Sequence, residues 1–367
     1  MPSVLYHVRS FGLLMNGSTM FETYAILGND CLVDILRSLH ARSYGILGLA
    51  LCIQGPSIPI NLLDLATNFR SAFQNLLHSP FLTTLCLQNI FGVPDTLIRW
   101  TSLKHLHFHF VELVRYRVDY DPLWILPPNA QIESLDIDFT FPFPPREVLE
   151  TGGIVQDDME AVSHFCNSFS GVTDLKYSIY HSSDFRLFCD VVLGLSSSLT
   201  TIELELSDTG RVLNRHIPWP LPFHRLPLLR SLTIRLRSLI SIETCGLLRH
   251  LSTILKDCSI PPSLQTIDFA LELRSQAQWL KLCDFFPQPS LWAVLDNILA
   301  THPQFAAIQS VYFNLQYRTL NEEPWAFDEG VFVARCATLV KELFPLLADS
   351  KTKLGAIVSV LSLPRDI

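Results

Sequence analysis

The sequence predicts an α/β fold in which about nine parallel strands, backed by helices, follow one another along the chain. The first observation is a pattern that occurs twice within residues 79–113: an apolar residue, two free positions, and then apolar residues at every second place. Such alternation is typical of a strand with one buried face. The second observation is that helical patterns fill the gaps between copies, as the crossovers between parallel strands require. The two copies are Leu82, Leu85 and Leu87, and then Leu103, Leu106, Phe108 and Phe110.

The same pattern recurs at intervals of 21 to 46 residues, which predicts an irregular leucine-rich-repeat solenoid. A tenth copy, at Leu354, Ile357 and Leu361, is incomplete because Ser359 stands where an apolar residue is expected. The other copies are Ile46, Leu49, Leu51 and Ile53; Ile132, Leu135, Ile137 and Phe139; Val172, Leu175, Tyr177 and Ile179; Leu199, Ile202, Leu204 and Leu206; Leu229, Leu232, Ile234 and Leu236; Leu264, Ile267, Phe269 and Leu271; and Ile308, Val311, Phe313 and Leu315.

Helical spacing of apolar residues predicts the elements between the strands. We expect helices over residues 62–78, 183–195, 241–256, 290–302 and 328–347, the last one ended or kinked by Pro345. Residues 1–45 do not match the repeat, although 31–40 has the spacing of a short amphipathic helix. The expected organisation is a non-repeat segment over 1–45 and one repeat domain over 46–367.

The net charge, the cysteine spacing and the lengths of the apolar runs restrict the partners and the location expected for this protein. The formal net charge of −8 argues against a nucleic-acid partner. Nine scattered cysteines without a CxxC pair indicate a reducing compartment, so we expect a cytoplasmic or nuclear location. The first 20 residues make a poor signal peptide, and no apolar run has the roughly 18–20 residues of a membrane helix, so no membrane partner is expected.

Residues between the apolar strand positions should form an exposed and mostly polar sheet face. His105, His107 and His109 alternate along one strand, about 7 Å apart, so all three share this face. Asp136 and Asp138 follow on the next strand. The cluster could be a solvated strand face, a contact for a partner, or a zinc site completed by one carboxylate. We assign it to partner binding and assign no metal.

Charges alternate in sign between later strands. Acidic, basic and again acidic residues stand on three successive strands, an order that suits either a self-neutralising ladder or a patch that reads a partner. The predicted partner-binding face therefore comprises His105, His107, His109, Asp136, Asp138, Glu203, Glu205, Arg235, Arg237, Asp268, Glu272 and Tyr312.

Signatures of catalysis are missing from the sequence. It contains no GxSxG, HExxH, GxxxxGK[ST] or GxGxxG motif, and no carboxylate pair stands in an apolar setting that would shift its pKa. The sequence predicts neither an enzyme nor a bound cofactor.

Two stretches, FRSAFQNLLHSPFLTTLCLQNIFGVPDTLIRWTSLKHLHF and SSLTTIELELS, resemble the F-box-like leucine-rich-repeat proteins of mushroom-forming (basidiomycete) fungi. In that family an N-terminal F-box binds the adaptor subunit of a cullin-type ubiquitin ligase, and the repeats present a substrate. Residues 1–45 depart from the family, because they lack the Leu-Pro-x-Glu helix and the Cys-x-x-Trp-type ending of an F-box.

The expected function is protein–protein recognition, as the substrate receptor of an SCF-type ubiquitin ligase. The resemblance implies an unknown protein substrate and the ligase adaptor and cullin subunits as partners. The alternatives are a stand-alone repeat scaffold without a ligase, and a zinc-dependent hydrolase built on the histidine strand.

Overall fold

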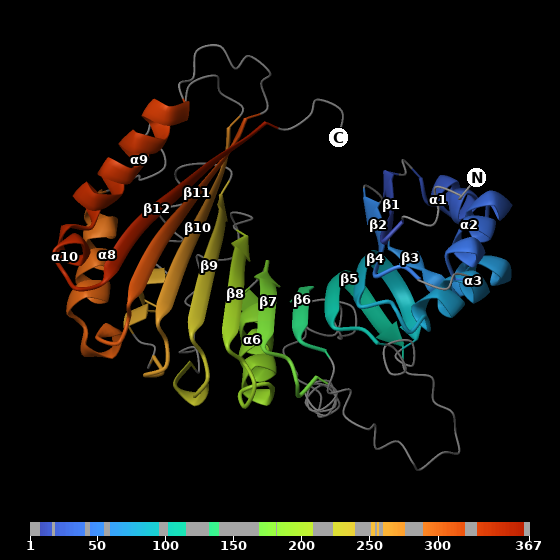
Figure 1. Cartoon of the computed structure of the whole chain (residues 1–367), viewed down its shortest axis with the longest axis horizontal. Coiled ribbons are helices and arrows are strands. Elements are labelled where there is room, and N and C mark those ends of the chain that lie inside the picture. The colour runs from blue at the N-terminus through green and yellow to red at the C-terminus, as the bar shows by residue number, and fades with distance from the viewer. Residues whose placement is uncertain are drawn as a thin grey trace. The chain divides into compact units, whose positions relative to one another are not determined.

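In a computed structural model, the chain divides into two compact units, Met1–Leu175 and Lys176–Ile367 (Figure 1). None of the helices in the described part of the chain is long and apolar enough to cross a membrane. The structure describes residues 8–16, 19–40, 45–54, 59–94, 102–114, 132–138, 169–180, 182–207, 223–238, 251–253, 255–256, 260–275, 289–319 and 329–362.

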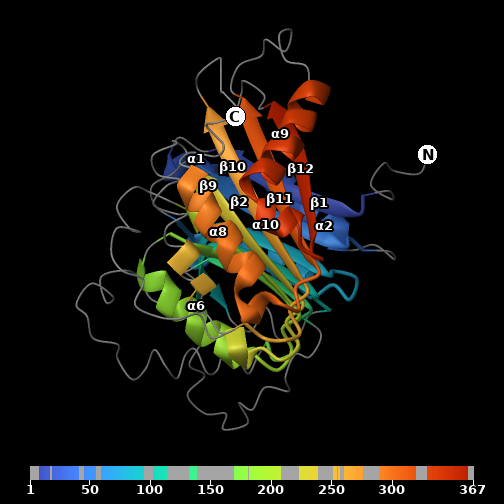
Figure 2. The same cartoon turned by 90° about the vertical axis from the view of Figure 1, so that its left-hand side faces the viewer.

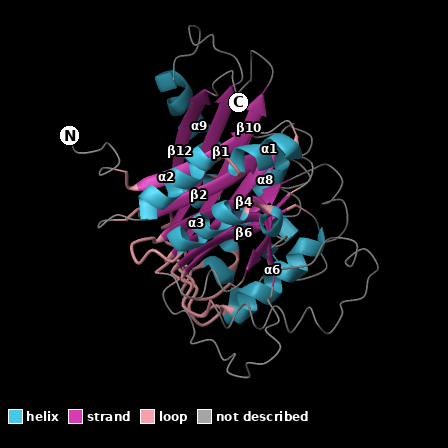
Figure 3. Cartoon of the chain, turned by 90° about the vertical axis from the view of Figure 1, so that its right-hand side faces the viewer, coloured by secondary structure: helices cyan, strands magenta, loops and turns pink. Residues whose placement is uncertain are grey.

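Strands of the first unit pair in the order β1, β2, β4, β5, β6, with β3 beside β4, and all these pairings are parallel. Figure 3 shows α2 and α3 in front of these strands. The elements are β1 (Ser10–Asn16), α1 (Met20–Leu27), α2 (Asp30–His40), β2 (Gly48–Gln54), β3 (Ile60–Asn61), a 3₁₀ turn (Leu62–Asp64), α3 (Thr67–Leu77), β4 (Thr84–Pro94), β5 (His105–Val114) and β6 (Ser134–Asp138).

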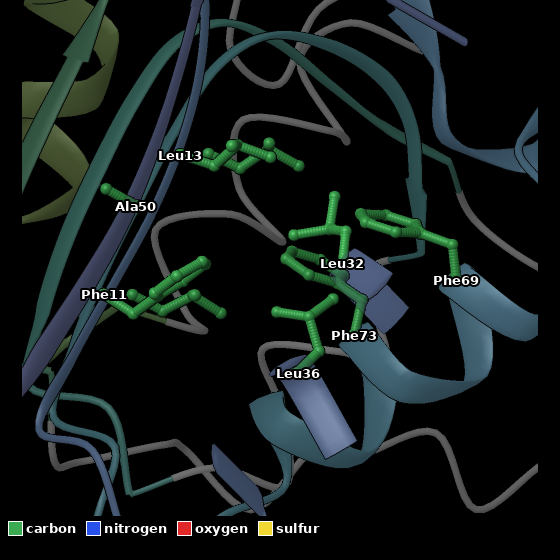
Figure 4. Close-up of a pocket in the computed structure, with 9 residues that line it drawn as sticks. Phe11, Leu13, Leu32, Leu36, Ala50, Phe69 and Phe73 are labelled. Carbon is green, nitrogen blue, oxygen red and sulfur yellow. The ribbon is translucent and has the colours of Figure 1, made fainter. Parts of the chain in front are cut away.

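Strand β1 lies within the segment that the sequence pattern does not cover. Its residues pair in register with β2 from Ser10 with Gly48 to Asn16 with Gln54. Phe11 and Leu13 face α2 and α3 across a small apolar cavity, which Leu32 and Phe73 line from the helix side (Figure 4). The sequence of this strand, SFGLLMN, has no clear alternation of apolar and polar residues, and two of its apolar side chains lie against α2 and α3. The helix predicted over 31–40 is confirmed as α2.

The second unit repeats the parallel arrangement, in the strand order β7 to β12. Helices α8, α9 and α10 contact one another (Figure 1, Figure 2). The elements are β7 (Asp174–Ile179, mostly in this unit), α6 (Ser182–Gly194), β8 (Thr201–Ser207), a 3₁₀ turn (Phe223–Arg225), β9 (Ser231–Ser238), β10 (Thr266–Ser275), α8 (Pro289–Thr301), a 3₁₀ turn (Pro303–Phe305), β11 (Ser310–Thr319), α9 (Glu329–Leu343), α10 (Pro345–Ala348) and β12 (Lys353–Ser362).

The predicted strand phase is confirmed in the nine main copies. Their apolar residues are at most 6% exposed, apart from Phe110, which is partly exposed, and Phe139, which lies outside the described residues. The core positions of each strand pair in register with core positions of the neighbouring strands, as Ile267 pairs with Leu232 and Val311. The chain is therefore an α/β protein built from a long series of parallel strands with helices, and the described residues contain twelve strands rather than about nine.

The tenth copy is present as β12, but its predicted phase was wrong. Leu354 pairs with Val311, so it occupies the second apolar position of the repeat rather than the first. Ala356 and Val358 continue the core side, while Ile357 pairs with Asn314 on the opposite face and is 51% exposed. The shift follows from the period of two: moving the pattern along a strand by an odd number of residues exchanges its faces.

Phe110 is the second exception to the predicted phase. It has a φ of +53°, in the left-handed region that residues with a Cβ rarely adopt, and Asn89 on β4 has a φ of +58°. The left-handed residue interrupts the alternation, so Val111 takes the core position that the pattern assigns to Phe110. Likewise, Ile90 takes a core position directly after the left-handed residue Asn89.

An aromatic cluster joins the helices of the second unit to β11. The ring of Phe313 lies 4.4 Å from that of Phe344, and the Trp292 ring contacts both at 6.2 and 5.8 Å. Beside them the buried carboxylate of Asp296 accepts the N–H groups of Leu346 and Leu347 at 2.9 and 3.0 Å. These donors lie at the start of α10, which begins at Pro345, so the predicted interruption of the last helix at Pro345 is confirmed. Burial raises the pKa of Asp296 although both hydrogen bonds lower it.

Replacing Asp296 with alanine should lower the free energy of unfolding by roughly 2 kcal/mol, because two N–H groups at a helix start lose their acceptor. Urea unfolding of the full chain, followed by circular dichroism, measures the loss. Asn297→Ala, at the exposed next position of α8, is the matched control and should change stability by less than about 0.5 kcal/mol. Equal effects of the two changes would contradict the capping role.

Candidate functional site

Side chains between the core positions form one face of the sheet in each unit. In the first unit we call this the histidine face, made by Cys52, Cys86, His105, His107, His109, Asp136 and Asp138. In the second unit we call it the charged face, made by Glu203, Glu205, Arg235, Asp268, Glu272, Tyr312, Asn314, Gln316, Lys353 and Ile357.

The histidine face is organised around two aspartates. His107 pairs in register with Asp136, and its Nδ1 lies 3.3 Å from Asp136 Oδ2. His109 Nε2 lies 3.2 Å from Asp136 Oδ1, and its Nδ1 lies 3.9 Å from Asp138 Oδ2. Two of the three predicted histidines are thus brought to carboxylates, whereas His105 pairs in register with Ser134 on the same face.

Asp136 and Asp138 are buried, 7% and 0% exposed, so the expectation that these positions are exposed was wrong for both. Asp138 accepts the N–H of Phe110 at 2.9 Å and therefore holds the left-handed residue of β5. Among the described residues, no group of three His, Cys, Asp or Glu side chains is arranged to hold a metal ion. The histidine rings are instead used in pairs with carboxylates.

The charged face contains the ladder that the sequence suggests. Arg235 Nε donates to Glu203 Oε1 at 2.9 Å and lies 3.9 Å from Glu205 Oε2. Its Nη1 donates to Gln316 Oε1 at 3.4 Å, two strands away. The strand between them carries Ala270 in register with Arg235, and a methyl side chain there leaves room for the guanidinium to cross.

Two more carboxylates flank this ladder. Glu272 is 1% exposed, as is Glu205, so the charged face is less open than expected. Burial raises the pKa of Asp268, Glu203 raises it further, and Arg235 lowers it. No local pattern around Asp268 predicts this shift in pKa, because Arg235 and Glu203 act on it from other strands. Arg237 pairs in register with Glu272 and Ser207, but its side chain lies outside the described residues.

The open end of the charged face lies on β11 and β12. Tyr312 pairs with Gly355, and its ring covers that glycine so closely that an added Cβ would lie 2.8 Å from the ring. Lys353 Nζ lies 5.7 Å from the ring centre. Hydrogen bonds with Ser310 and Lys353 lower the pKa of Tyr312. Ile357 stands in the next position of this face, 51% exposed.

Sequence reasoning found Tyr312 but missed its three neighbours on β12. The cause is the phase of the tenth copy, which placed Ile357 in the core. Aligning Leu354 with Val311 instead of Ile308 would have identified Lys353, Gly355 and Ile357 as surface positions.

No protein-family model matches the chain, and no curated protein sequence matches it. Among solved structures, it is similar to the chain in the crystal structure of the TLR13–ssRNA13 complex, with 13% identity and a TM-score of 0.33. The alignment covers 97% of this chain and 50% of that one, so this chain spans about half the length of the solved chain.

We expect the Arg235 side chain to stabilise the fold. Arg235→Met is expected to lower the free energy of unfolding by about 2–4 kcal/mol, because Glu205 is buried and loses a counter-ion. Adding Glu205→Gln should recover part of that loss. Lys353→Met, which removes an exposed cation from the same face, is the control and should cost less than about 1 kcal/mol. If Arg235→Met leaves stability unchanged, the ladder does not stabilise the fold.

Proposed function

We propose that this chain is a protein-recognition module that binds its partner through the charged face of the second unit. The observation that carries the proposal is the pair of strands β11 and β12, where Ile357, Tyr312 and Lys353 share a face. On the opposite side of the same strands, Phe313 of β11 contacts Trp292 of α8, and β12 contacts α9 and α10. The fold therefore gains little from an exposed isoleucine there, whereas tyrosine is among the residues enriched in binding hot spots, and Ile357 adds apolar surface beside Tyr312.

The chemistry of this face favours a protein. Tyr312 is fixed over Gly355, and Arg235 is fixed by Glu203 and Gln316, so little side-chain entropy is lost when a partner binds. The acidic residues around the ladder repel phosphate groups, which supports the exclusion of nucleic acid. We propose neither a membrane partner nor a cofactor.

The module is proposed to act without catalysis. Its charged side chains neutralise one another across neighbouring strands, an arrangement that serves recognition and stability rather than proton transfer. The zinc-hydrolase alternative would build its site on the histidine rings of β5, but among the described residues no group of three His, Cys, Asp or Glu side chains is arranged to hold a metal ion.

The finer proposal is that the module is the substrate receptor of an SCF-type ubiquitin ligase in the cytoplasm or nucleus. Its support is the resemblance of residues 69–108 and 197–207 to the F-box-like repeat family. The adaptor would then dock on residues 1–45, where the described residues form β1, α1 and α2 instead of a recognisable F-box. A stand-alone scaffold is the alternative.

Ile357→Arg should remove the partner while leaving the fold intact, because position 357 is half exposed and faces away from the core. Quantitative mass spectrometry of proteins captured by the tagged full chain identifies the partner, and binding of the purified partner is then measured by calorimetry. We expect at least a tenfold loss of affinity. Val294→Arg, at a 48% exposed apolar position on α8, is the control and should bind normally. Equal binding by both variants would overturn the assignment of the face.

The ligase role is tested by capture from an extract of a mushroom-forming fungus, with blots for the adaptor and cullin subunits. Recovery of both subunits with the full chain, and loss of both after charge reversal of exposed α2 residues such as Asp34→Lys, would support the receptor role. Recovery of other proteins without either subunit would leave the scaffold alternative.

A further inference from the structure

Two cysteines from neighbouring strands meet on the histidine face. Cys52 on β2 and Cys86 on β4 place their sulfur atoms 3.6 Å apart, in hydrogen-bond contact. Both side chains are partly exposed, and the core positions beside them, Leu51 and Leu87, point the other way. The pair is therefore on the face of the sheet that a reagent reaches, in contrast to Cys336, which is buried.

The groups around the pair hold a thiolate on one sulfur. Cys86 stands in register with His107, and the charges of His109 and His107 both act on Cys52. The hydrogen bond from Cys86 is the largest cause that lowers the pKa of Cys52, to about 7, although burial opposes it.

Cys86 is shifted in the other direction. Its hydrogen bond to Cys52, its own burial, the Cys52 charge and Asp136 all raise its pKa. Either sulfur can donate in this contact; once Cys52 is the thiolate, Cys86 keeps its proton and is the donor. The remaining neighbours in register are uncharged: Leu14 and Gln88 beside Cys52, and Ala50 beside Cys86.

We propose that Cys52 and Cys86 form a redox-sensitive thiol pair, in which the Cys52 sulfur forms a mixed disulfide with one half of a low-molecular-weight disulfide. The contact between the two sulfurs carries the inference, since neither thiol alone would distinguish this site from the other cysteines of the chain. The proposal concerns the first unit and does not depend on the binding function proposed for the second.

The exchange balances without any further oxidant. The Cys52 thiolate attacks one sulfur of the reagent disulfide RSSR, a new S–S bond forms to Cys52, and RS⁻ leaves with the electron pair of the broken bond. Cys86 then loses its proton to the released RS⁻, giving RSH, and attacks the Cys52 sulfur; the bond between Cys52 and SR breaks, the second RS⁻ leaves with its electron pair, and an internal disulfide forms. Because the two cysteines are diagonal rather than directly opposed, with Cys52 facing Gln88, this second step requires the strands to shift.

The test uses oxidised glutathione and the full chain, with the adduct on each cysteine quantified by peptide mass spectrometry over a pH series. We expect Cys52 to react much faster at pH 7 than Cys189, whose pKa burial raises to about 12, and Cys336, whose pKa burial raises to about 11. The rate at Cys52 should rise to a plateau above pH 7, because the thiolate is the reactive form.

Two variants distinguish the effect of the Cys86 hydrogen bond on Cys52 from the effect of solvent exposure alone. Cys86→Ala removes the donor, and the rate at Cys52 at pH 7 should fall roughly three- to sixfold, since the lost thiolate fraction is partly offset by greater nucleophilicity. Cys86→Ser keeps a hydroxyl donor and should stay within about twofold of the unchanged chain. Thermal unfolding checks that both variants fold.

Either a mixed disulfide on Cys52 or an internal Cys52–Cys86 disulfide in the unchanged chain supports the proposal, provided that Cys86→Ala slows formation of the mixed disulfide on Cys52. Unselective reaction of Cys52 and Cys189, or an unchanged rate in the folded Cys86→Ala variant, would overturn it.

Discussion

In-register pairing of parallel strands is the constraint on which the rest of this structure depends. Successive side chains of a strand point to opposite faces, so one pairing register decides the surroundings of every residue on both strands. Phe269 illustrates this, because it stands between Ile234 and Phe313 and stacks on the Phe313 ring at 5.2 Å. The helices then bury the same side, through contacts such as that of Trp292 with Phe313.

The same register determines the chemistry of the opposite face. Neighbouring strands lie roughly 5 Å apart, so polar residues at paired positions are forced into contact whatever their charge. Carboxylates become buried there and require partners, which His107 and His109 supply for Asp136, and Arg235 supplies for Glu203. The faces are therefore preorganised by ion pairs, whereas Ile357 on β12 is left half exposed.

Two residues with a left-handed backbone interrupt the regular pairing of the strands. Phe110 adopts a left-handed conformation that a phenylalanine does not favour, and the Asp138 carboxylate on the next strand binds its N–H. Asn89 has a similar backbone on β4, where its side-chain amide donates to the Ile53 carbonyl at 2.6 Å. Each left-handed residue is thus held by a hydrogen bond to a neighbouring strand, and it moves the following core residue into place.

The sequence by itself determined the strand phase of nine copies, the helices α2 and α8, and the break at Pro345, because these depend on periodicity within one segment. It also placed the acidic and basic residues on adjacent strands of one face. Only the tertiary structure decided that β1 joins the sheet, that Ile357 is exposed and that Glu205 is buried. It alone brought Cys52 to Cys86, which are 34 residues apart in the chain. The physical reason is that a local pattern sorts side chains between two faces, whereas their burial and partners come from strands that lie some 20 to 45 residues away.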